Sequence, residues 1–484
     1  MTSAPAWARH LPAGRDWEAL DLLAGGSIPA VVARWGEVQP LRPAFGAVTW
    51  RELLGRSELA AGRLAGMGLR RGDRVLCSAA PSVDLVVAHL AALRMGAVVV
   101  PANTAYGPAE LAHIIDDAQP SLAIVDAPGR VADLPTVGPD LAVGEGHVPR
   151  LDALDVGDPA LIGYTSGTTG RPKGALLTHG NLLAGARSVV VAWRWSPQDR
   201  LALALPLFHA HGLCVGVHGT LVAGGSADVL PRFDVDAVLD TVEAGATLVF
   251  GVPTMWSRLA ASSRAGVLRG ARLCVSGSAP LDPALAARVR DASGQDVLER
   301  YGMTETLMLA SNPVEGERRP GTVGIPLPGV TVRLAEDGEI LVRGPAVFAG
   351  YRGLPVGPYF DADGFFRTGD VGRWDDDGYL RIVGRTKELI ITGGFNVYPR
   401  EVEEVLLDHP AVAEAAVVGL PSEEWGETVT AAVVARGPVD PAELVAWCRE
   451  RLAPFKCPRA VHVVDALPRN ALGKVARDQL RAAL

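Results

Sequence analysis

Apolar runs and amphipathic segments alternate along most of the chain. An apolar run at 73–80 precedes a segment of helical periodicity at 82–96, which ends on Gly96, and a second apolar run covers 97–103. This order predicts a strand, a helix and a second strand, with parallel strands and a right-handed crossover. Runs that are apolar at nearly every position are typical of strands buried on both faces.

The same alternation continues towards residue 300. Further strands are predicted at 122–127, 200–207, 226–231, 246–251 and 271–277, and helices at 212–224, 234–245 and 282–294. The stretch 133–159, rich in Gly, Pro and Asp, is predicted to be a long surface loop. The pattern predicts an α/β fold, with a large N-terminal body of parallel-type β-sheets flanked by helices.

The pattern changes after about residue 330. Two segments, 330–344 and 372–385, each place an acidic, Gly-containing turn between alternating runs, which indicates β-hairpins. The last hundred residues mix helices (399–410, 440–454) with strands (412–421, 428–436). We therefore expect the large body and a small β section in residues 1–384 and a compact α+β domain at 389–484.

Composition narrows the function classes. Hydrophobic residues make up 48% of the chain, charged residues 21%, and the net charge is −8, so we expect a globular protein that does not bind nucleic acid. The first twenty residues show no signal-peptide core, and no window reaches the roughly 18 apolar residues that span a bilayer. The five cysteines are scattered along the chain and show no metal-ligand spacing. We therefore expect them to be small buried residues, reduced as in the cytoplasm. We therefore expect no membrane insertion and a cytoplasmic location.

The stretch YTSGTTGRPKG, residues 164–174, carries the first candidate chemistry. Glycines let the backbone approach an anion, hydroxyl groups donate hydrogen bonds, and Lys173 supplies a positive charge. The spacing differs from the GxxxxGK[ST] phosphate loop, because two residues separate Gly167 from Gly170 and Gly174 follows the lysine. A phosphate-binding loop is favoured over a flexible turn.

This stretch and seven further motifs resemble the adenylate-forming superfamily of acyl-CoA synthetases, peptide-synthetase adenylation domains and luciferases. In order they are PLFHAHG (206–212), GVPTMW (251–256), VSGSAPL (275–281), ERYGMTET (299–306), FFRTGD (365–370), GRTKELIITGGFNVYPREVEE (384–404) and PRNALGK (468–474). The resemblance implies that a carboxylate attacks the α-phosphate of ATP with Mg²⁺, and that the thiol of coenzyme A then displaces AMP.

The resemblance also implies roles for residues of the large body. Tyr301 matches a residue that stacks on adenine, Thr304 an α-phosphate contact, and Glu305 the magnesium ligand. One larger set matches the loop that holds the β- and γ-phosphates: Thr165, Ser166, Gly167, Thr168, Thr169 and Lys173. A second set matches the segment that lines the adenine and part of the acyl pocket: Gly277, Ser278, Ala279 and Pro280.

Other matches lie towards the C-terminus. Asp370 and Arg385 match contacts to the ribose, and Lys387 matches a hinge, here 385–388, about which a mobile C-terminal domain rotates. Lys474 matches the lysine that acts during adenylation. Gly393, Gly394 and Phe395 match the loop that lines the pantetheine channel during thioester formation.

The motifs look most like those of malonyl-CoA synthetases, which implies malonate or methylmalonate as the acid. Arg258 then matches the group that binds the distal carboxylate, Ser278 assists, and His209 lies beside the acyl pocket. The small residues Ala210 and Gly212 leave a bulky hydrophobic acid as an alternative. Delivery to a carrier protein instead of coenzyme A, a luciferase-type reaction and an inactive binding protein are further alternatives, and both monomer and homodimer fit the sequence.

Overall fold

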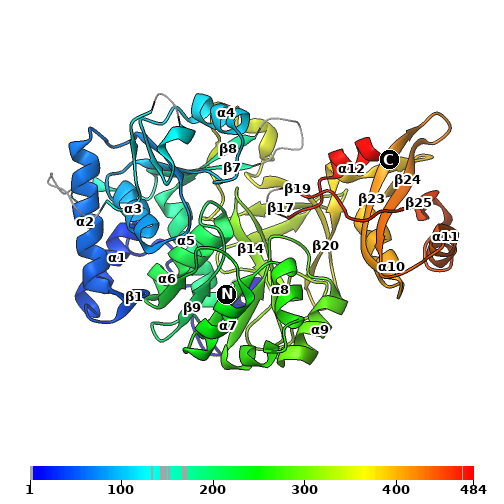
Figure 1. Cartoon of the computed structure of the whole chain (residues 1–484), viewed down its shortest axis with the longest axis horizontal. Helices are drawn as coiled ribbons and strands as arrows, with labels where there is room; N and C mark the ends of the chain where they lie inside the picture. Colours follow the sequence, from blue (N-terminus) through cyan, green and yellow to red (C-terminus); the bar gives the residue numbers. More distant parts are fainter. Residues whose placement is uncertain (1–3, 132–133, 142–149, 151–152, 166–171, 471–472) are drawn as a thin grey trace. The chain divides into compact units, whose positions relative to one another are not determined.

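The computed structural model describes residues 4–484 except 132–133, 142–149, 151–152, 166–171 and 471–472. Two compact units make up the chain (Figure 1). The first comprises Met1–Val332, Val342–Phe366 and Asp376–Leu380, and the second Arg333–Leu341, Arg367–Asp375 and Arg381–Leu484. The predicted α/β class is confirmed. The expected hinge and the boundary at residue 384 concern movement between parts and stay predictions.

A nine-stranded sheet forms one layer of the first unit, in the order β15-β14-β13-β12-β11-β9-β10-β1-β2. Strands β10, β9, β11, β12 and β13 pair in parallel, whereas β14 and β15 continue antiparallel. The bounds are β1 (Pro43–Phe45), β2 (Val48–Thr49), β9 (Arg200–Leu203), β10 (Ser226–Val229), β11 (Leu248–Gly251), β12 (Leu273–Ser276), β13 (Leu298–Met303), β14 (Leu307–Ser311) and β15 (Ile325–Pro326). The carboxyl ends of the parallel strands therefore meet at one edge.

A seven-stranded sheet, β18-β8-β7-β4-β3-β5-β6, lies in the same unit. Its bounds are β3 (Arg74–Ser78), β4 (Val98–Pro101), β5 (Leu122–Val125), β6 (Thr136–Val137), β7 (Pro159–Thr165), β8 (Lys173–Thr178) and β18 (Gly350–Tyr351). Strands β3 and β4 are parallel and joined by a helix, so the first predicted strand–helix–strand unit is confirmed. The expected long loop 133–159 is interrupted by β6, because Thr136 and Val137 pair with β5.

Helices cover these sheets (Figure 1). They are α1 (Ile28–Val38), α2 (Trp50–Gly66), α3 (Val83–Arg94), α4 (Pro108–Ala118), α5 (His179–Ala192), α6 (His218–Ala223), α7 (Val235–Glu243), α8 (Pro253–Ala260) and α9 (Pro283–Ser293). Side-chain caps begin several of them; the Thr49 hydroxyl, for example, accepts from the Glu52 N–H at the start of α2. The helix expected at 212–224 is divided, since His211–Val217 forms a π-helix, η4, before α6.

The second unit is an α+β structure, as expected. It holds a five-stranded sheet, in which β22-β21-β24-β23 are consecutive and β25 pairs with β24, and most of a four-stranded sheet, β16-β17-β19-β20. The bounds are β16 (Thr331–Leu334), β17 (Glu339–Arg343), β19 (Phe366–Trp374), β20 (Leu380–Arg385), β21 (Ile390–Thr392), β22 (Phe395–Val397), β23 (Val412–Ser422), β24 (Gly426–Ala435), β25 (Ala460–Val463), α10 (Pro399–Leu407), α11 (Pro441–Arg449) and α12 (Arg477–Ala483). Apolar residues of β23, β24, α10 and α11 form its core.

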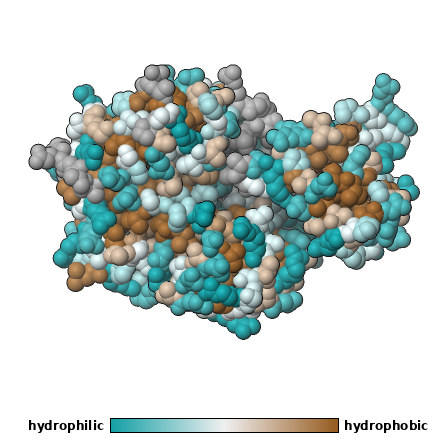
Figure 2. Space-filling view, in the orientation of Figure 1, coloured by the Kyte–Doolittle hydropathy of each residue, from teal (hydrophilic) through white to brown (hydrophobic). Residues whose placement is uncertain are grey.

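The surface and the cysteines have the properties expected from the amino-acid composition. Hydrophilic and hydrophobic residues are interspersed over the face seen in Figure 2, as is usual for folded proteins. All five cysteines are free and buried, and burial raises the pKa of Cys77, Cys214 and Cys274 to about 12. Within the described ranges, every helix is too short or too polar to cross a membrane.

Candidate active site

The predicted site segments of the first unit follow adjacent parallel strands. Residues 206–212 follow β9, the turn after Gly251 follows β11, Gly277–Pro280 follow β12, and Thr304–Glu305 follow β13. Because β9, β11, β12 and β13 are neighbours in the sheet, these segments meet at its carboxyl edge. The geometry of a doubly wound sheet thus brings together motifs that lie about a hundred residues apart in the sequence.

Thr304 lies against the end of β7, the strand that leads into the predicted phosphate loop. A methyl group in place of the Gly163 hydrogen would lie only 2.4 Å from Thr304 Cγ2, so the glycine is required for this approach. A cavity of about 30 Å³ opens beside the contact, and Thr304, Gly163, Phe208, His209 and Ala210 are among the residues that line it.

Glu305 is buried at 4% exposure and is held by two groups. Its Oε1 atom accepts a 2.7 Å hydrogen bond from the Tyr351 hydroxyl, and its backbone carbonyl accepts one from the Phe348 N–H. The Tyr351 ring also lies 5.5 Å from Lys173 Nζ, which donates to the Tyr359 hydroxyl over 3.1 Å. Tyr351 therefore links the predicted magnesium ligand to the predicted phosphate-binding lysine, and the sequence did not indicate it.

The two ends of the predicted phosphate loop are described, but most of the loop is not. Thr165 ends β7 and pairs with Lys173, which begins β8, in an antiparallel hairpin. Ser166, Gly167, Thr168 and Thr169 lie outside the described residues. The hairpin is anchored by Tyr164, whose hydroxyl donates a short hydrogen bond to Asp117.

The segment after β12 is close to a buried histidine. Ser278 has a left-handed backbone, with φ +68°, and its Oγ lies 3.3 Å from His211 Nδ1. Non-glycine residues held in this conformation cost free energy and cluster at functional sites. His211 is 2% exposed, and burial is the main cause that lowers its pKa well below the usual value; nearby Arg300 contributes. His211 is therefore a neutral imidazole in this setting.

Arg300, which precedes Tyr301 in β13, was not singled out from the sequence. Its guanidinium lies under Gly277, where a methyl group would come within 2.2 Å of the Arg300 Cζ atom. The residue is 4% exposed, and its Nε and Nη2 atoms have no hydrogen-bond partner in the described part of the chain. Burial lowers the pKa of Arg300 to about 9, so it remains a cation at neutral pH. Because β13 is buried on both faces, period-2 alternation could not reveal it.

The other predicted residues of the first unit have different surroundings. Tyr301 is buried at 8% exposure, and Ala279 and Pro280 follow Ser278 in the turn after β12. Arg258 is exposed on α8, and its guanidinium lies 5.2 Å from the centroid of the Phe233 ring. The structure therefore does not bring Arg258 into the same buried setting as Ser278 and His211.

In the second unit, Asp370 and Arg385 are brought together. Asp370 on β19 is 4% exposed, and its Oδ1 lies 2.6 Å from Arg385 Nε on β20. The two residues that match ribose contacts are thus neighbours. Arg385 keeps 41% of its side chain exposed.

The remaining predicted residues also lie in the second unit. Lys387 is exposed in a short 3₁₀ segment, Thr386–Glu388, and Lys474 is exposed, with its backbone carbonyl accepting a hydrogen bond from the Asn470 N–H. Gly393 and Gly394 have φ of +57° and +81° between β21 and β22. Phe395 is 54% exposed and stacks on Phe455 at 4.6 Å.

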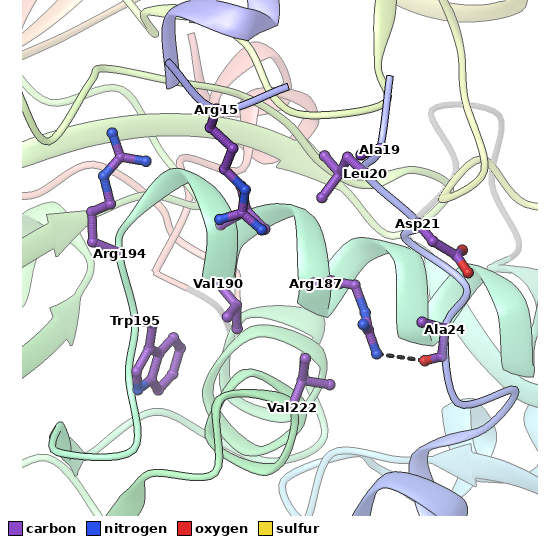
Figure 3. Close-up of a pocket in the computed structure, with 11 residues that line it drawn as sticks. Arg15, Ala19, Leu20, Asp21, Ala24, Arg187, Val190, Arg194, Trp195 and Val222 are labelled. Atoms are coloured by element: carbon purple, nitrogen blue, oxygen red, sulfur yellow. Dashed lines mark hydrogen bonds between the residues drawn. The ribbon is translucent and has the colours of Figure 1, made fainter. Parts of the chain in front are cut away.

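A much larger cavity lies away from these residues. It has a volume of about 560 Å³ and lies between residues 15–24 and helices α5 and α6 (Figure 3). Apolar side chains such as Val190 and Val222 line it, together with Arg15, Arg187 and Arg194. Among the described residues, none that was predicted for the site lines this cavity, so we place the chemistry at the strand ends.

The donor set fits a magnesium ion carried by a phosphate ligand. Within the described ranges, no cluster of three His, Cys, Asp or Glu side chains is arranged to hold a metal alone. Glu305 offers a buried carboxylate that Tyr351 orients. Mg²⁺ is commonly bound by one or two carboxylates plus substrate phosphate oxygens, and it neutralises developing phosphate charge.

Comparisons with known proteins agree with this geometry. The AMP-binding enzyme family model matches residues 32–352, and the AMP-binding enzyme C-terminal domain matches residues 401–474. Feruloyl-CoA synthase from Amycolatopsis sp is 38% identical over 463 residues, which cover 90% of this chain and 94% of that protein.

Two solved structures are similar over most of the chain. ATP-bound MatB from Rhodopseudomonas palustris has a TM-score of 0.88 and 40% identity, and the match covers 94% of this chain and 99% of that one. A malonyl-CoA ligase in a ternary product complex with methylmalonyl-CoA and AMP has a TM-score of 0.67 and 44% identity, over 88% of this chain and 97% of that one.

The chain therefore belongs to the AMP-binding enzyme family. Within this family it is an acyl-CoA ligase, an acid–thiol ligase whose cofactors are ATP, Mg²⁺ and coenzyme A. Its substrates include a small-molecule carboxylic acid. The predicted superfamily, enzyme class and cofactors are confirmed.

Proposed function

We propose that the acid is malonate, or a malonate with a small substituent at C2 such as methylmalonate. A carboxylate oxygen attacks the α-phosphorus of ATP and releases pyrophosphate, which forms the acyl-adenylate. The thiolate of coenzyme A then attacks the acyl carbon and releases AMP. The product is malonyl- or methylmalonyl-CoA.

The observation that carries this proposal is the buried guanidinium of Arg300, whose Nε and Nη2 atoms have no hydrogen-bond partner among the described residues. A cation removed from water is costly unless an anion accompanies it, and a planar guanidinium pairs best with a carboxylate. A monocarboxylate has no anion left after adenylation, whereas a dicarboxylate keeps its second carboxylate. Arg300 lies against Gly277, beside the Ser278–His211 pair, so polar groups for that carboxylate are gathered in one place.

Two of the similar proteins differ in the acid that their names give. The feruloyl-CoA synthase relative acts, by its name, on a bulky aromatic acid, whereas the malonyl-CoA ligase structure holds methylmalonyl-CoA. The buried charge of Arg300 favours the second kind of acid for this chain.

We also propose the roles of the matched residues in the two steps. Thr165, Lys173 and the loop between them bind the ATP phosphates, Thr304 contacts the α-phosphate, and Glu305 holds Mg²⁺. Lys474 stabilises the charge that develops during adenylation, an effect commonly worth roughly 10²–10³ in rate. The segment Thr392–Asn396, here called the glycine loop, serves the thioester step, and coenzyme A is proposed as the acceptor in place of a carrier protein.

The test compares four carboxylic acids as substrates and two arginine variants of the protein. Rates of pyrophosphate release are measured with malonate, methylmalonate, acetate and ferulate, for the unaltered protein and for Arg300→Gln and Arg258→Gln. We expect malonate and methylmalonate to be preferred, and Arg300→Gln to raise the KM for malonate by about 10²-fold or more, since breaking a buried ion pair costs about 3–5 kcal/mol. The exposed Arg258 is the matched control.

Two results would contradict the proposal. One is a preference of the unaltered protein for acetate or ferulate over malonate. The other is a larger loss of malonate binding in Arg258→Gln than in Arg300→Gln, which would restore the role predicted for Arg258 from the sequence.

A further inference from the structure

The glycine loop has two direct supports in the second unit, and one of them is Trp425. The Gly393 N–H donates a 2.8 Å hydrogen bond to the Trp425 carbonyl. A methyl group at Gly393 would lie 2.9 Å from Trp425 Cε3, so the indole packs directly against the loop backbone. We propose that Trp425 is a positioning residue that holds the glycine loop for the thioester step. This inference rests on the role of the loop in the proposed function.

Trp425 is itself fixed by several contacts. The Arg459 guanidinium lies 4.0 Å from the centroid of the indole ring, and the Trp425 N–H donates to Ser422 Oγ over 3.3 Å. Gly426, the next residue, pairs with Thr392 of the loop across β24 and β21. The Glu427 carboxylate accepts a 2.8 Å hydrogen bond from the Ile391 N–H. The turn that carries Trp425 is therefore joined to the strand that leads into the loop.

The second support holds the opposite end of the loop. Phe395 is 54% exposed, yet its ring stacks on Phe455 at 4.6 Å and 23°. Gly393 is thus held by Trp425 and Phe395 by Phe455, with Gly394 between them. The loop is fixed at both sides, although its middle residue has open space around it.

Such supports matter because of the two glycines. Gly393 and Gly394 both adopt positive φ, which glycine does readily, but glycine also has the largest conformational freedom to lose. A loop that samples many conformations seldom presents its catalytically useful one. A misplacement of about 1 Å can reduce a rate by about 10²-fold. Loss of the Trp425 contact should therefore slow only the step that uses the loop.

The experiment measures the two half-reactions separately. Adenylation is followed by exchange of labelled pyrophosphate into ATP without coenzyme A, and thioester formation by a single turnover of preformed malonyl-adenylate with coenzyme A. We expect Trp425→Leu to slow the thioester step by about 10- to 100-fold and to leave pyrophosphate exchange within about twofold. Trp425→Tyr, which keeps a ring beneath Arg459, should restore most of the rate.

Trp447→Leu is the matched control. Trp447 also lies in the second unit with an arginine over its ring, Arg451 at 3.3 Å, but it sits on α11 and donates to the Val405 carbonyl. Equal effects of Trp425→Leu on both half-reactions, no effect on either, or a thioester defect of the same size in Trp447→Leu would each overturn the inference. Failure of the unaltered protein to convert malonyl-adenylate would instead contradict the proposed function.

Discussion

Tyr351 donates a 2.7 Å hydrogen bond to Glu305, and the same ring lies 5.5 Å from the ammonium group of Lys173. One side chain thus touches both a carboxylate proposed to hold Mg²⁺ and a cation proposed to hold phosphate. Orientation by an outer partner of this kind is a common property of metal ligands. It makes Tyr351 a sensitive position for adenylation.

Replacing Tyr351 by Phe should weaken adenylation without unfolding the protein. The change removes the hydrogen bond to Glu305 but keeps the ring beside Lys173, and a hydrogen bond to a charged group contributes about 1.5–3 kcal/mol. We expect the Mg²⁺ concentration for half-maximal pyrophosphate exchange to rise by about tenfold. Tyr359→Phe, which removes the hydroxyl that accepts from Lys173 and leaves the hydrogen bond of Glu305 intact, is the control. An equal Mg²⁺ requirement in both variants would contradict this role.

Asp370→Asn should weaken ATP binding more than it weakens the fold. The carboxylate is buried, but its partner Arg385 is 41% exposed, and such solvent-screened pairs contribute at most about 1 kcal/mol to stability. If Asp370 binds ribose hydroxyls, the KM for ATP should rise by about tenfold while Tm changes by only a few degrees. Arg385→Gln is measured alone and in combination with Asp370→Asn, which gives the coupling free energy between the two side chains. A large loss of Tm with unchanged KM would assign the pair a structural role only.

Gly163→Ala should displace Thr304. The added methyl group would meet Thr304 Cγ2 at 2.4 Å, and overpacking of this kind costs about 1–3 kcal/mol. We expect a lower Tm and slower pyrophosphate exchange. Gly55→Ala in α2, where a methyl group meets nothing within 4 Å, should instead be neutral or stabilising by about 0.5–1 kcal/mol. If Gly163→Ala exchanged pyrophosphate at the rate of the unaltered protein, the proposed role of Thr304 in adenylation would be contradicted.

Three buried histidines should make the protein sensitive to acid. Burial lowers the pKa of His89 to about 3 and of His179 to about 4, and that of His218 well below the usual value. His89 Nε2 and His218 Nε2 are 2.8 Å apart, which requires one of them to donate and the other to accept. Because the unfolded chain takes up these protons below about pH 6.5 and the folded chain does not, the free energy of unfolding falls as pH drops from about 6.5 towards 4.

The measurement is Tm as a function of pH. We expect a steady fall of Tm between about pH 7 and about pH 5, with a shallower fall in His89→Leu, where one of these groups no longer titrates. The exposed His462 is replaced by Gln as the control. An unchanged slope in His89→Leu would show that the acid sensitivity comes from other groups.

Much of this architecture could be predicted from the sequence. Parallel strands that are buried on both faces appear in the sequence as apolar runs. The strands predicted at 73–80, 97–103 and 246–251 therefore correspond to β3, β4 and β11. The resemblance to the adenylate-forming superfamily then predicted roles for Glu305, Asp370 and Arg385, and these roles stay predictions. Three features carried no local signal. Tyr351 meets Glu305 from a strand 46 residues away, Arg300 lies in a strand with both faces buried, and the π-helical turn at His211 resembles an ordinary helix in periodicity.

The division of the chain into units has a consequence for dissection by fragments. Segments Arg333–Leu341 and Arg367–Asp375 belong with Arg381–Leu484, although residues of the first unit separate them. No single cut can therefore release the second unit whole: a polypeptide starting at residue 385 would lack β16, β17, β19 with Asp370, and all of β20 except Arg385. To divide this enzyme into two complementing fragments, the order of its segments would have to be changed, because one break in the chain does not separate the two units.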